Sequence, residues 1–253
     1  IRVSPDNRMT IHLGVILLSG GLDSTTLAAL ILTRDIRLSA LTFDYGQTHR
    51  RELEAASAIA NRLGIDQSVV DVSFYRNLAN HSALTNSDTH FLPTGRSESE
   101  MATDIPITYV PLRNTFFLTL AAARLESLAL AEIEDNGTAP DQVKATLFIA
   151  ANAIDYSGYP DCRPEYYQAA KDALNRGSKL WTQYGVGFRI ETPLIEMSKA
   201  EIVQSAIDVG APIDLSWSCY RDGETPCGAC DSCLLRAKGF SEASATDPAL
   251  PSS

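Results

Sequence analysis

The sequence predicts an α/β fold in which a parallel sheet is covered by helices on both faces, with a short metal-binding segment near the C-terminus. Apolar runs such as 13–18 lack the alternation of half-exposed strands, which is typical of parallel strands buried on both faces. Stretches with helical spacing of apolar residues, such as 53–63, separate these runs. Four of the five cysteines lie between 219 and 233, where they indicate an added metal-binding segment.

The length fits one α/β domain with a small addition. A chain of 253 residues with 45% hydrophobic and 21% charged residues has the composition of an ordinary globular protein with a sizeable core. We expect the α/β domain over 9–210 and the four-cysteine segment over 211–240. A flexible tail is expected over 241–253, where Ser, Ala and Pro accumulate.

The composition also excludes some classes of partner. A net charge of −10 argues against a surface that coats nucleic acid. No apolar run reaches the length of a membrane span, and residues 1–8 lack the apolar region of a secretory signal. We therefore expect a cytoplasmic protein without nucleic-acid or membrane partners, in which Met9 is a candidate initiator.

The expected elements alternate along the chain. The strands are apolar runs at 13–18, 38–43, 66–72, 147–150 and 188–192. The helices are one that includes 27–31, then 51–63, 115–130, 164–176 and 199–209. The last helix opens with a capping box formed by Ser198 and Glu201. The segment 74–104 lacks periodicity, so we expect a loop that covers the active site; the alternative is a variable surface insertion. The acidic segment 131–144 is expected to be an exposed connection.

The loop at 18–26 joins the first expected strand to the first helix. Gly20 and Gly21 let the backbone approach a ligand closely, and the free N–H groups at the start of a helix suit a phosphate. Asp23 is suited to hold a metal-bound phosphate or the loop itself. Further hydroxyl donors are Ser19, Ser24, Thr25 and Thr26. The alternative is an ordinary tight turn, which has similar residues. The Walker motif and the dinucleotide-binding motif are both absent from this loop.

Other polar residues are expected at the same edge of the sheet. The second strand ends close to Tyr45, and ligands of such sheets lie beyond the carboxyl ends of the strands. Arg113 precedes a helix, where its charge can reach a phosphate, although a structural or solvated arginine fits the same position. Lys199 lies in a first helical turn, where a cation opposes the helix dipole unless an anion is near; the alternative is a surface lysine.

The segment 151–164 follows another strand end and is rich in polar and aromatic residues. Two carboxylates, two tyrosines and an arginine there can recognise an aromatic ligand that forms hydrogen bonds. A turn-rich connection capped by Asp161 is the alternative. Cys162 has no cysteine or histidine close in sequence, so we expect a small buried or pocket residue.

Cys219, Cys227, Cys230 and Cys233 have the spacing C-x7-C-x2-C-x2-C. Four thiolates at short spacing suit one tetrahedral zinc without an open position, which makes the site structural. An iron–sulfur cluster is the less favoured alternative, and a disulfide is less favoured still.

Several motifs in one order along the chain carry a family resemblance. They are SGGLDS at 19–24, FDYGQ at 43–47, YVPLRN at 109–114, DYSGYPDCR at 155–163, ETPL at 191–194, KAE at 199–201 and SCY at 218–220 ahead of the last three cysteines. SGGLDS resembles the PP-loop of the ATP pyrophosphatases. The whole set resembles the 7-cyano-7-deazaguanine synthase family within that group, from about residue 13 to 240.

The resemblance implies a Rossmann-like (adenine nucleotide alpha hydrolase-like) fold and a carbon–nitrogen ligase of queuosine biosynthesis. The implied reaction converts 7-carboxy-7-deazaguanine and ammonia to the 7-nitrile, with ATP as co-substrate, Mg bound to ATP and zinc in the structural site. The carboxylate is adenylated and displaced by ammonia to an amide. A second ATP then activates the amide oxygen, which leaves as part of AMP.

The resemblance also implies roles for the residues at matching positions. Implied ATP-binding residues are Leu18, Ser19, Gly20, Gly21, Leu22, Asp23, Ser24, Thr25, Thr26, Leu27, Ala28, Phe43 and Tyr45. Asp23, Arg113 and Lys199 are implied to be catalytic, with Asp23 near the metal or pyrophosphate and the two cations near developing phosphate charge. Implied substrate-binding residues are Asp155, Tyr156, Tyr159, Asp161 and Arg163.

Two departures from the family pattern bear on the substrate. Ala150 and Ala151 stand where members usually have a glycine, and a Cβ there could narrow the pocket. The acidic segment 132–144 also looks longer than usual. The alternatives are a related enzyme that joins the acyl group to a protein amine, a tRNA-thiolating enzyme and a zinc-stabilised binding module without catalysis. A homodimer is compatible with the sequence.

Overall fold

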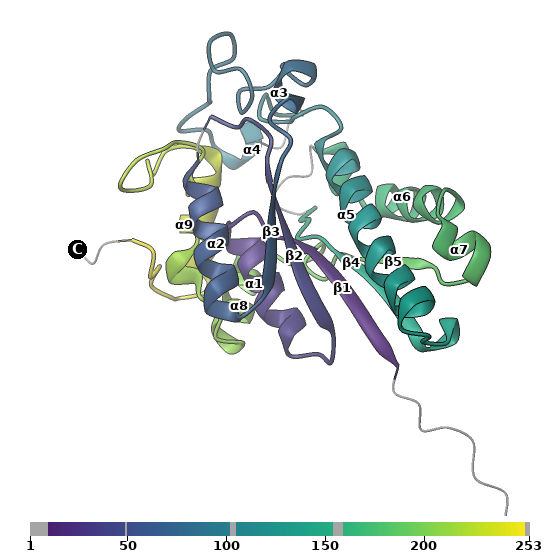
Figure 1. The fold of residues 1–253 in the computed structure, drawn as a ribbon. Coiled ribbons are helices and arrows are strands. Elements are labelled where there is room, and N and C mark those ends of the chain that lie inside the picture. Colours follow the sequence, from purple (N-terminus) through teal and green to yellow (C-terminus); the bar gives the residue numbers. More distant parts are fainter. Residues whose placement is uncertain (1–9, 49, 102–104, 154–158, 251–253) are drawn as a thin grey trace, which may run out of the picture.

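The computed structural model describes residues 10–48, 50–101, 105–153 and 159–250. Its centre is a five-stranded parallel sheet in the order β3-β2-β1-β4-β5 (Figure 1). The strands are β1 Ile11–Leu17, β2 Arg37–Asp44, β3 Asp66–Asp71, β4 Val143–Phe148 and β5 Phe188–Glu191. The expected parallel sheet is confirmed, and its strands lie within two residues of their expected positions, except that β4 begins and ends earlier than the expected 147–150.

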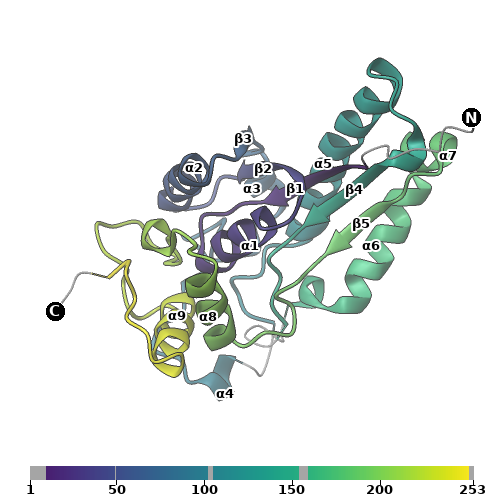
Figure 2. The same cartoon turned by 90° about the horizontal axis from the view of Figure 1, so that it is seen from below.

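Helices cover both faces of the sheet. The helices are α1 Leu22–Leu32, α2 Arg51–Leu63, α3 Tyr75–Leu78, α4 Glu98–Met101, α5 Arg113–Leu130, α6 Pro164–Arg176, α7 Lys179–Tyr184, α8 Lys199–Asp208 and α9 Asp231–Glu242. Helices α5 and α6 pack on one face, and α1 and α2 lie on the other (Figures 1 and 2). Helix α8 packs against α1, and α9 packs against α8 (Figure 2). The α/β class with a C-terminal addition is therefore confirmed.

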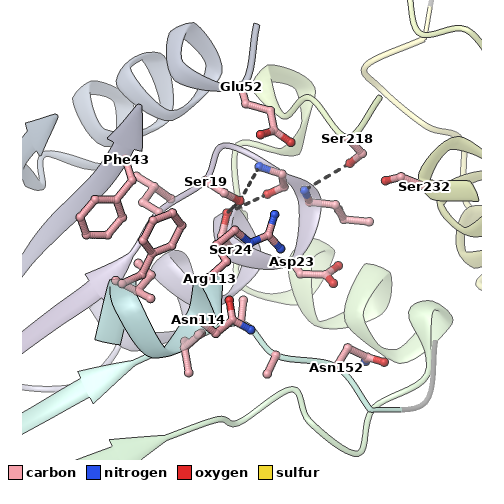
Figure 3. Close-up of a pocket in the computed structure, with 18 of the residues that line it drawn as sticks. Ser19, Asp23, Ser24, Phe43, Glu52, Arg113, Asn114, Asn152, Ser218 and Ser232 are labelled. Carbon is pink, nitrogen blue, oxygen red and sulfur yellow. Dashed lines mark hydrogen bonds between the residues drawn. The ribbon is translucent and has the colours of Figure 1, made fainter. Parts of the chain in front are cut away.

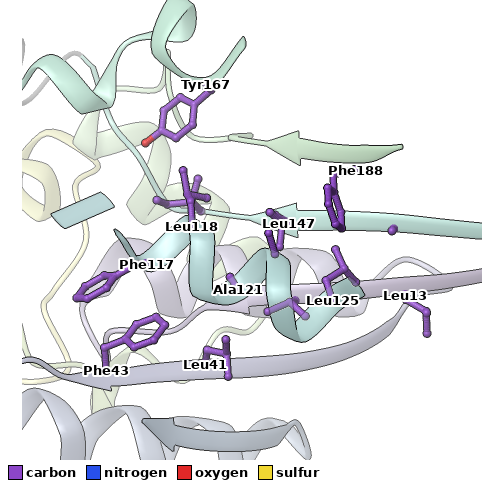
Figure 4. Close-up of a cluster of buried hydrophobic side chains, with 14 of the residues drawn as sticks. Leu13, Leu41, Phe43, Phe117, Leu118, Ala121, Leu125, Leu147, Tyr167 and Phe188 are labelled. Atoms are coloured by element: carbon purple, nitrogen blue, oxygen red, sulfur yellow. The ribbon is translucent and has the colours of Figure 1, made fainter. Parts of the chain in front are cut away.

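The apolar run of β1 is explained by cores on both of its faces. Leu13 and Val15 belong to the core under α5, whereas Ile16 belongs to the core under α1 and α2. Figure 4 shows the core under α5, in which Phe43 stacks on Phe117 with ring centroids 4.3 Å apart. Both faces of the strand are buried, so its sequence shows no alternation.

The acidic segment 131–144 differs from the expected exposed connection. Helix α5 continues as a π-helical turn, Ala131–Asp135, and β4 begins at Val143 rather than at 147. Glu132 is buried, where it pairs with Arg37 of β2 and accepts a hydrogen bond from Asn136 over 3.1 Å. Residues 134–137 are exposed as expected. The expectation was wrong for Glu132, because Arg37, which is distant in sequence, offsets the charge of this carboxylate.

The capping box of α8 is confirmed. The N–H of Glu201 donates to Ser198 Oγ over 3.3 Å, and the N–H of Ser198 donates to Glu201 Oε2 over 2.7 Å. These two bonds satisfy free N–H groups at the helix start and fix the direction in which α8 leaves the sheet.

No helix in the described part of the chain is both long and apolar enough to cross a bilayer.

Part of the segment expected to be a tail packs onto the fold. Helix α9 reaches Glu242, and Asp247 beyond it is buried. Asp247 forms a two-point ion pair with Arg236 of α9, with Nε–Oδ2 and Nη2–Oδ1 distances of 2.6 and 2.9 Å. The chain is therefore anchored to α9 at least as far as Asp247.

Candidate active site

A cavity of about 290 Å³ lies beyond the carboxyl ends of β1, β2 and β4. One wall comes from the β1–α1 loop, the end of β2, the start of α5 and the residues after β4. We call this the sheet wall. The opposite wall comes from the start of α8, the residues around Cys219 and helix α9, and we call it the C-terminal wall (Figure 3). The cavity occupies the edge at which the sequence predicted a nucleotide site.

Gly20 in the β1–α1 loop is needed for packing against α2. Its φ is +85°, and a Cβ at this position would lie 2.4 Å from the carbonyl oxygen of Glu52 and 2.7 Å from the nitrogen of Ala56. A side chain would therefore push α2 away from the loop. Gly21, which caps α1, has more room, because a Cβ there would lie 3.5 Å from Ser19 Oγ.

The structure divides the predicted ATP-binding residues into two groups. Those that line the cavity are Leu18, Ser19, Gly21, Leu22, Asp23, Ser24, Phe43 and Tyr45. Gly20 is buried and does not line it, and neither do Thr25, Thr26, Leu27 and Ala28, which are fully buried in α1. Thr25 Oγ1 donates to Gly21 O over 2.7 Å and Thr26 Oγ1 donates to Leu22 O over 2.9 Å. Their hydroxyls are thus used within the helix, which corrects the expectation that they donate to a phosphate.

Asp23 and Lys199, which are 176 residues apart, meet in the cavity. Lys199 Nζ donates to both carboxylate oxygens of Asp23 over 2.9 and 2.8 Å. A Cβ on Gly239 of α9 would lie 2.3 Å from Lys199 Cγ, so this glycine gives the lysine stem its room. The alternative of an exposed surface lysine is therefore excluded, since Lys199 is 8% exposed.

Arg113 begins α5 and reaches the cavity from the sheet wall (Figure 3). Its Nη1 donates to the hydroxyl of Tyr45 over 3.2 Å, and its guanidinium lies 5.6 Å from the Tyr45 ring centroid. Burial alone would lower the pKa of Arg113, but Tyr45, Tyr159 and Asp161 outweigh it and raise the pKa. The guanidinium therefore stays charged. No carboxylate forms an ion pair with it among the described residues.

The predicted substrate-binding residues are not all brought together. Tyr159 lines the cavity, and its hydroxyl lies 2.6 Å from Thr108 Oγ1. Burial raises the pKa of Tyr159 to about 12. Asp161 is buried behind the lining, and burial raises its pKa while Arg113 opposes this. Arg163 is exposed and outside the lining. Asp155 and Tyr156 lie outside the described residues.

Ala150, Ala151 and Cys162 line the cavity. The two alanines that depart from the family pattern therefore lie at the cavity. Burial, with a smaller contribution from Asp161, raises the pKa of Cys162 to about 12, so this thiol is neutral and inert near pH 7.

Several lining residues were missed in the sequence. Asn152 is buried and donates to the carbonyl oxygens of Leu194 and Met197 over 3.2 and 2.6 Å, which ties the ends of β4 and β5 together. The other missed residues of note are Ser218, Tyr220, Ser232 and Arg236 of the C-terminal wall. They flank the cysteines, and this proximity to a metal motif was the one signal that could have drawn attention to them.

The four cysteines form a candidate metal site. Their Sγ atoms all lie within 4.8 Å of one another, with 4.0 Å between those of Cys227 and Cys233. Backbone N–H groups of Arg221 and Cys227 donate to Cys219 Sγ, each over 3.4 Å. Such bonds stabilise thiolates, and thiolates this close repel one another unless a cation binds. The residues present therefore fit a tetrahedral four-thiolate metal.

The loop 74–104 is joined to this metal segment. Thr94 forms an isolated antiparallel bridge with Cys230, and the N–H of Gly95 donates to Ala229 O over 2.9 Å. Arg96 pairs with the buried Asp231 directly after Cys230. Farther back, Leu84 of the same loop lines the cavity. One loop therefore connects the ligand cavity to the cysteine cluster.

The parallel sheet, the SGGLDS turn at the cavity and the cations around it define an ATP-dependent enzyme of the PP-loop superfamily. The family profile described as queuosine biosynthesis protein QueC matches residues 13–244, which is most of the chain. The chain belongs to this family.

Curated relatives agree with this assignment. The chain is 44% identical to the 7-cyano-7-deazaguanine synthase of Thermoplasma acidophilum over 92% of its length and 90% of the relative. It is 45% identical to that of Thermoplasma volcanium, with 92% and 88% covered, and 44% identical to that of Trichodesmium erythraeum, with 93% and 99% covered.

A solved NMN synthetase from Francisella tularensis is 14% identical with a TM-score of 0.37, over 92% of this chain and 72% of that one. An NH3-dependent NAD synthetase from Campylobacter jejuni is 13% identical with a TM-score of 0.40, over 83% and 68%. Because both TM-scores are low, the fold assignment rests on the sheet of this chain itself.

Proposed function

We propose that this chain is a 7-cyano-7-deazaguanine synthase, which converts 7-carboxy-7-deazaguanine and ammonia to the 7-nitrile at the expense of ATP. The observation that carries the proposal is family membership across the chain, together with a cavity that holds the family motifs from both walls. The names of the relatives do not favour a protein amine as the acceptor.

The cavity is suited to ATP in three respects. The first-turn N–H groups of α1 and the Ser19 side chain are suited to bind an anion. Arg113 supplies a positive charge that no described carboxylate pairs with. Asp23 offers the hard oxygen ligands that Mg²⁺ prefers, and Mg²⁺ would neutralise phosphate charge when bound with ATP.

The reaction balances without water. One carboxylate oxygen becomes bonded to the α-phosphorus of ATP as pyrophosphate leaves, and ammonia then replaces it with release of AMP and a proton. The amide oxygen repeats this with a second ATP, and loss of AMP and of both amide protons leaves the carbon–nitrogen triple bond. The protein contributes placement of the reactants and stabilisation of developing phosphate charge by Arg113 and Lys199.

For the four-cysteine site, we propose a structural zinc. The donor set is all thiolate and offers no further protein ligand, so the metal would hold the C-terminal wall in shape rather than activate a nucleophile. Metal analysis of the purified protein is expected to give about one zinc per chain. Labile sulfide and visible colour would instead establish an iron–sulfur cluster.

The proposed reaction is tested with an isotope-labelled substrate. The protein is incubated with Mg-ATP, [15N]ammonium and 7-carboxy-7-deazaguanine carrying 18O in its carboxylate, and the products are analysed by mass spectrometry. We expect 15N in the nitrile and one 18O in the phosphate of each AMP. A Lys171→Met variant, altered on the exposed side of α6, serves as a fully active control.

Two results would contradict the proposal. No AMP and no nitrile from zinc-loaded protein would overturn the synthase assignment. Labelled AMP without nitrile would show that the acid is adenylated but that a different amine is the acceptor.

A further inference from the structure

The hydroxyl of Ser218 has both of its acceptor positions filled. Arg236 Nη1 donates to Ser218 Oγ over 3.1 Å, and the backbone N–H of Leu22 donates to it over 3.5 Å. A serine hydroxyl accepts two hydrogen bonds and donates one. Its O–H is therefore left to donate, and no acceptor for it is found among the described residues.

The position of Ser218 restricts what this O–H can meet. Ser218 lines the cavity, and its contact with Leu22 places it at the first turn of α1, opposite Ser19 and Ser24 (Figure 3). The first-turn N–H groups of a helix attract anions. An O–H donor beside them would add to the same anion site from the C-terminal wall.

Arg236 is held firmly in the position from which it contacts Ser218. Its guanidinium forms two hydrogen bonds to the Asp247 carboxylate. The side chains of Arg236 and Asp247 are only 7% and 5% exposed, respectively. Its Nη1 also donates to Ser216 Oγ over 2.9 Å. A bidentate, buried pair fixes geometry more strictly than a single contact, and a charged donor polarises the hydroxyl that accepts from it. Because Asp247 offsets its charge, Arg236 serves to orient Ser218 and not to bind the anion directly.

We propose that Ser218 donates a hydrogen bond to a phosphate oxygen of ATP, and that Arg236 and Asp247 are positioning residues that direct this hydroxyl. The inference rests on the proposed function for the identity of the anion. It assigns a role to Asp247, which lies in the segment expected to be a flexible tail. The C-terminal segment thus contributes to the nucleotide site through a chain of contacts, Asp247 to Arg236 to Ser218 to Leu22.

Equilibrium binding of Mg²⁺ with α,β-methylene ATP, followed by calorimetry, tests the role of Ser218. Ser218→Ala should bind about tenfold more weakly, because a hydrogen bond to a charged group is lost. Ser218→Thr keeps the hydroxyl and should restore most of the affinity. Ser205→Ala, on α8 and away from the cavity, is the matched control and should bind as the wild type does.

A double-mutant cycle tests the positioning role. Asp247→Asn should weaken binding in the wild type but not further in Ser218→Ala, while it lowers the melting temperature in both. A purely structural role of Asp247 would instead weaken binding equally in both backgrounds, and this result would overturn the positioning role.

The outcomes separate this proposal from the proposed function. Unchanged affinity in Ser218→Ala overturns the assignment of Ser218 alone. Wild-type protein that binds the analogue but forms no nitrile overturns the synthase reaction and leaves Ser218 as a phosphate donor. Wild-type protein that binds no analogue overturns both.

Discussion

The two walls of the cavity use their positive charges differently. In the sheet wall, Arg113 contacts the neutral Tyr45, and no described carboxylate pairs with it. In the C-terminal wall, Lys199 and Arg236 each pair with a carboxylate at two points, Asp23 and Asp247 respectively. The paired cations join segments that are distant in sequence, whereas the charge of Arg113 is available to a ligand.

This contrast suggests that Arg113 serves mainly the ligand, whereas the paired cations of the C-terminal wall also stabilise the fold. A buried cation with a carboxylate partner holds two segments in one geometry, and removal of either partner leaves an uncompensated charge. A partly buried cation without an ion-pair partner, such as Arg113, keeps more of its charge available to an anionic ligand. Each of the following experiments alters one side of this comparison.

Arg113→Met should have the largest effect on activity. We expect kcat/KM to fall by about 10²–10³-fold, because a preorganised charge at the phosphates is lost. Stability should change by only about 1 kcal/mol, since the lost hydrogen bond is to a neutral hydroxyl. Steady-state kinetics and denaturant titration measure both. Arg124→Met, on the exposed face of the same helix, is the control, and a strongly destabilised but catalytically normal Arg113→Met would reverse the assignment of the walls.

Removal of the metal should loosen the C-terminal wall selectively. Treatment with a strong chelator is expected to raise hydrogen exchange more than tenfold in α9 and around 94–97, because four neighbouring thiolates lose the cation that holds them. Strand β1 and helix α5 should keep their protection. Hydrogen-exchange mass spectrometry follows each segment, and equal loosening in both walls would contradict the division.

Breaking the Asp23–Lys199 pair should affect both stability and activity. Lys199→Met leaves Asp23 without its partner and should cost about 2 kcal/mol, at the lower end for such pairs because Asp23 is partly exposed. The double variant Asp23→Asn/Lys199→Met should recover most of the stability but not the activity. Thermal unfolding and AMP formation separate the two effects. Recovery of activity in the double variant would show that the pair has a structural role only.

Cys162 should give the smallest effect, and only at high pH. Because its pKa is raised to about 12 in the folded protein, ionisation of this thiol favours the unfolded chain once pH exceeds the ordinary value of 9.0. Stability from this group is therefore complete below pH 9 and falls above it by about 1.4 kcal/mol per pH unit. Cys162→Ser should lack this part of the fall between pH 8 and 10 in denaturant titrations, and identical pH profiles would show that Cys162 ionises freely.

Much of the fold could be predicted because the signals are local. The apolar runs of β1 and β2, the capping box at Ser198 and the cysteine spacing each involve neighbouring residues, and each appears where it was expected. Glu132 in the segment 131–144 was wrongly expected to be exposed, because its burial depends on Arg37, which the fold brings to it from another strand. The packing of Asp247 escaped prediction for the same reason.

The SGGLDS turn illustrates where sequence determines this protein and where the tertiary structure decides. The sequence by itself determined the turn between β1 and α1, the family and the cluster of cysteines, because these depend on short-range geometry and side-chain chemistry. Only the tertiary structure decided that Thr25 and Thr26 turn inward, that Asp23 meets Lys199, and that Ser218 lies against the start of α1. Those contacts are set by the packing of α8 and α9 onto α1, which no local pattern encodes.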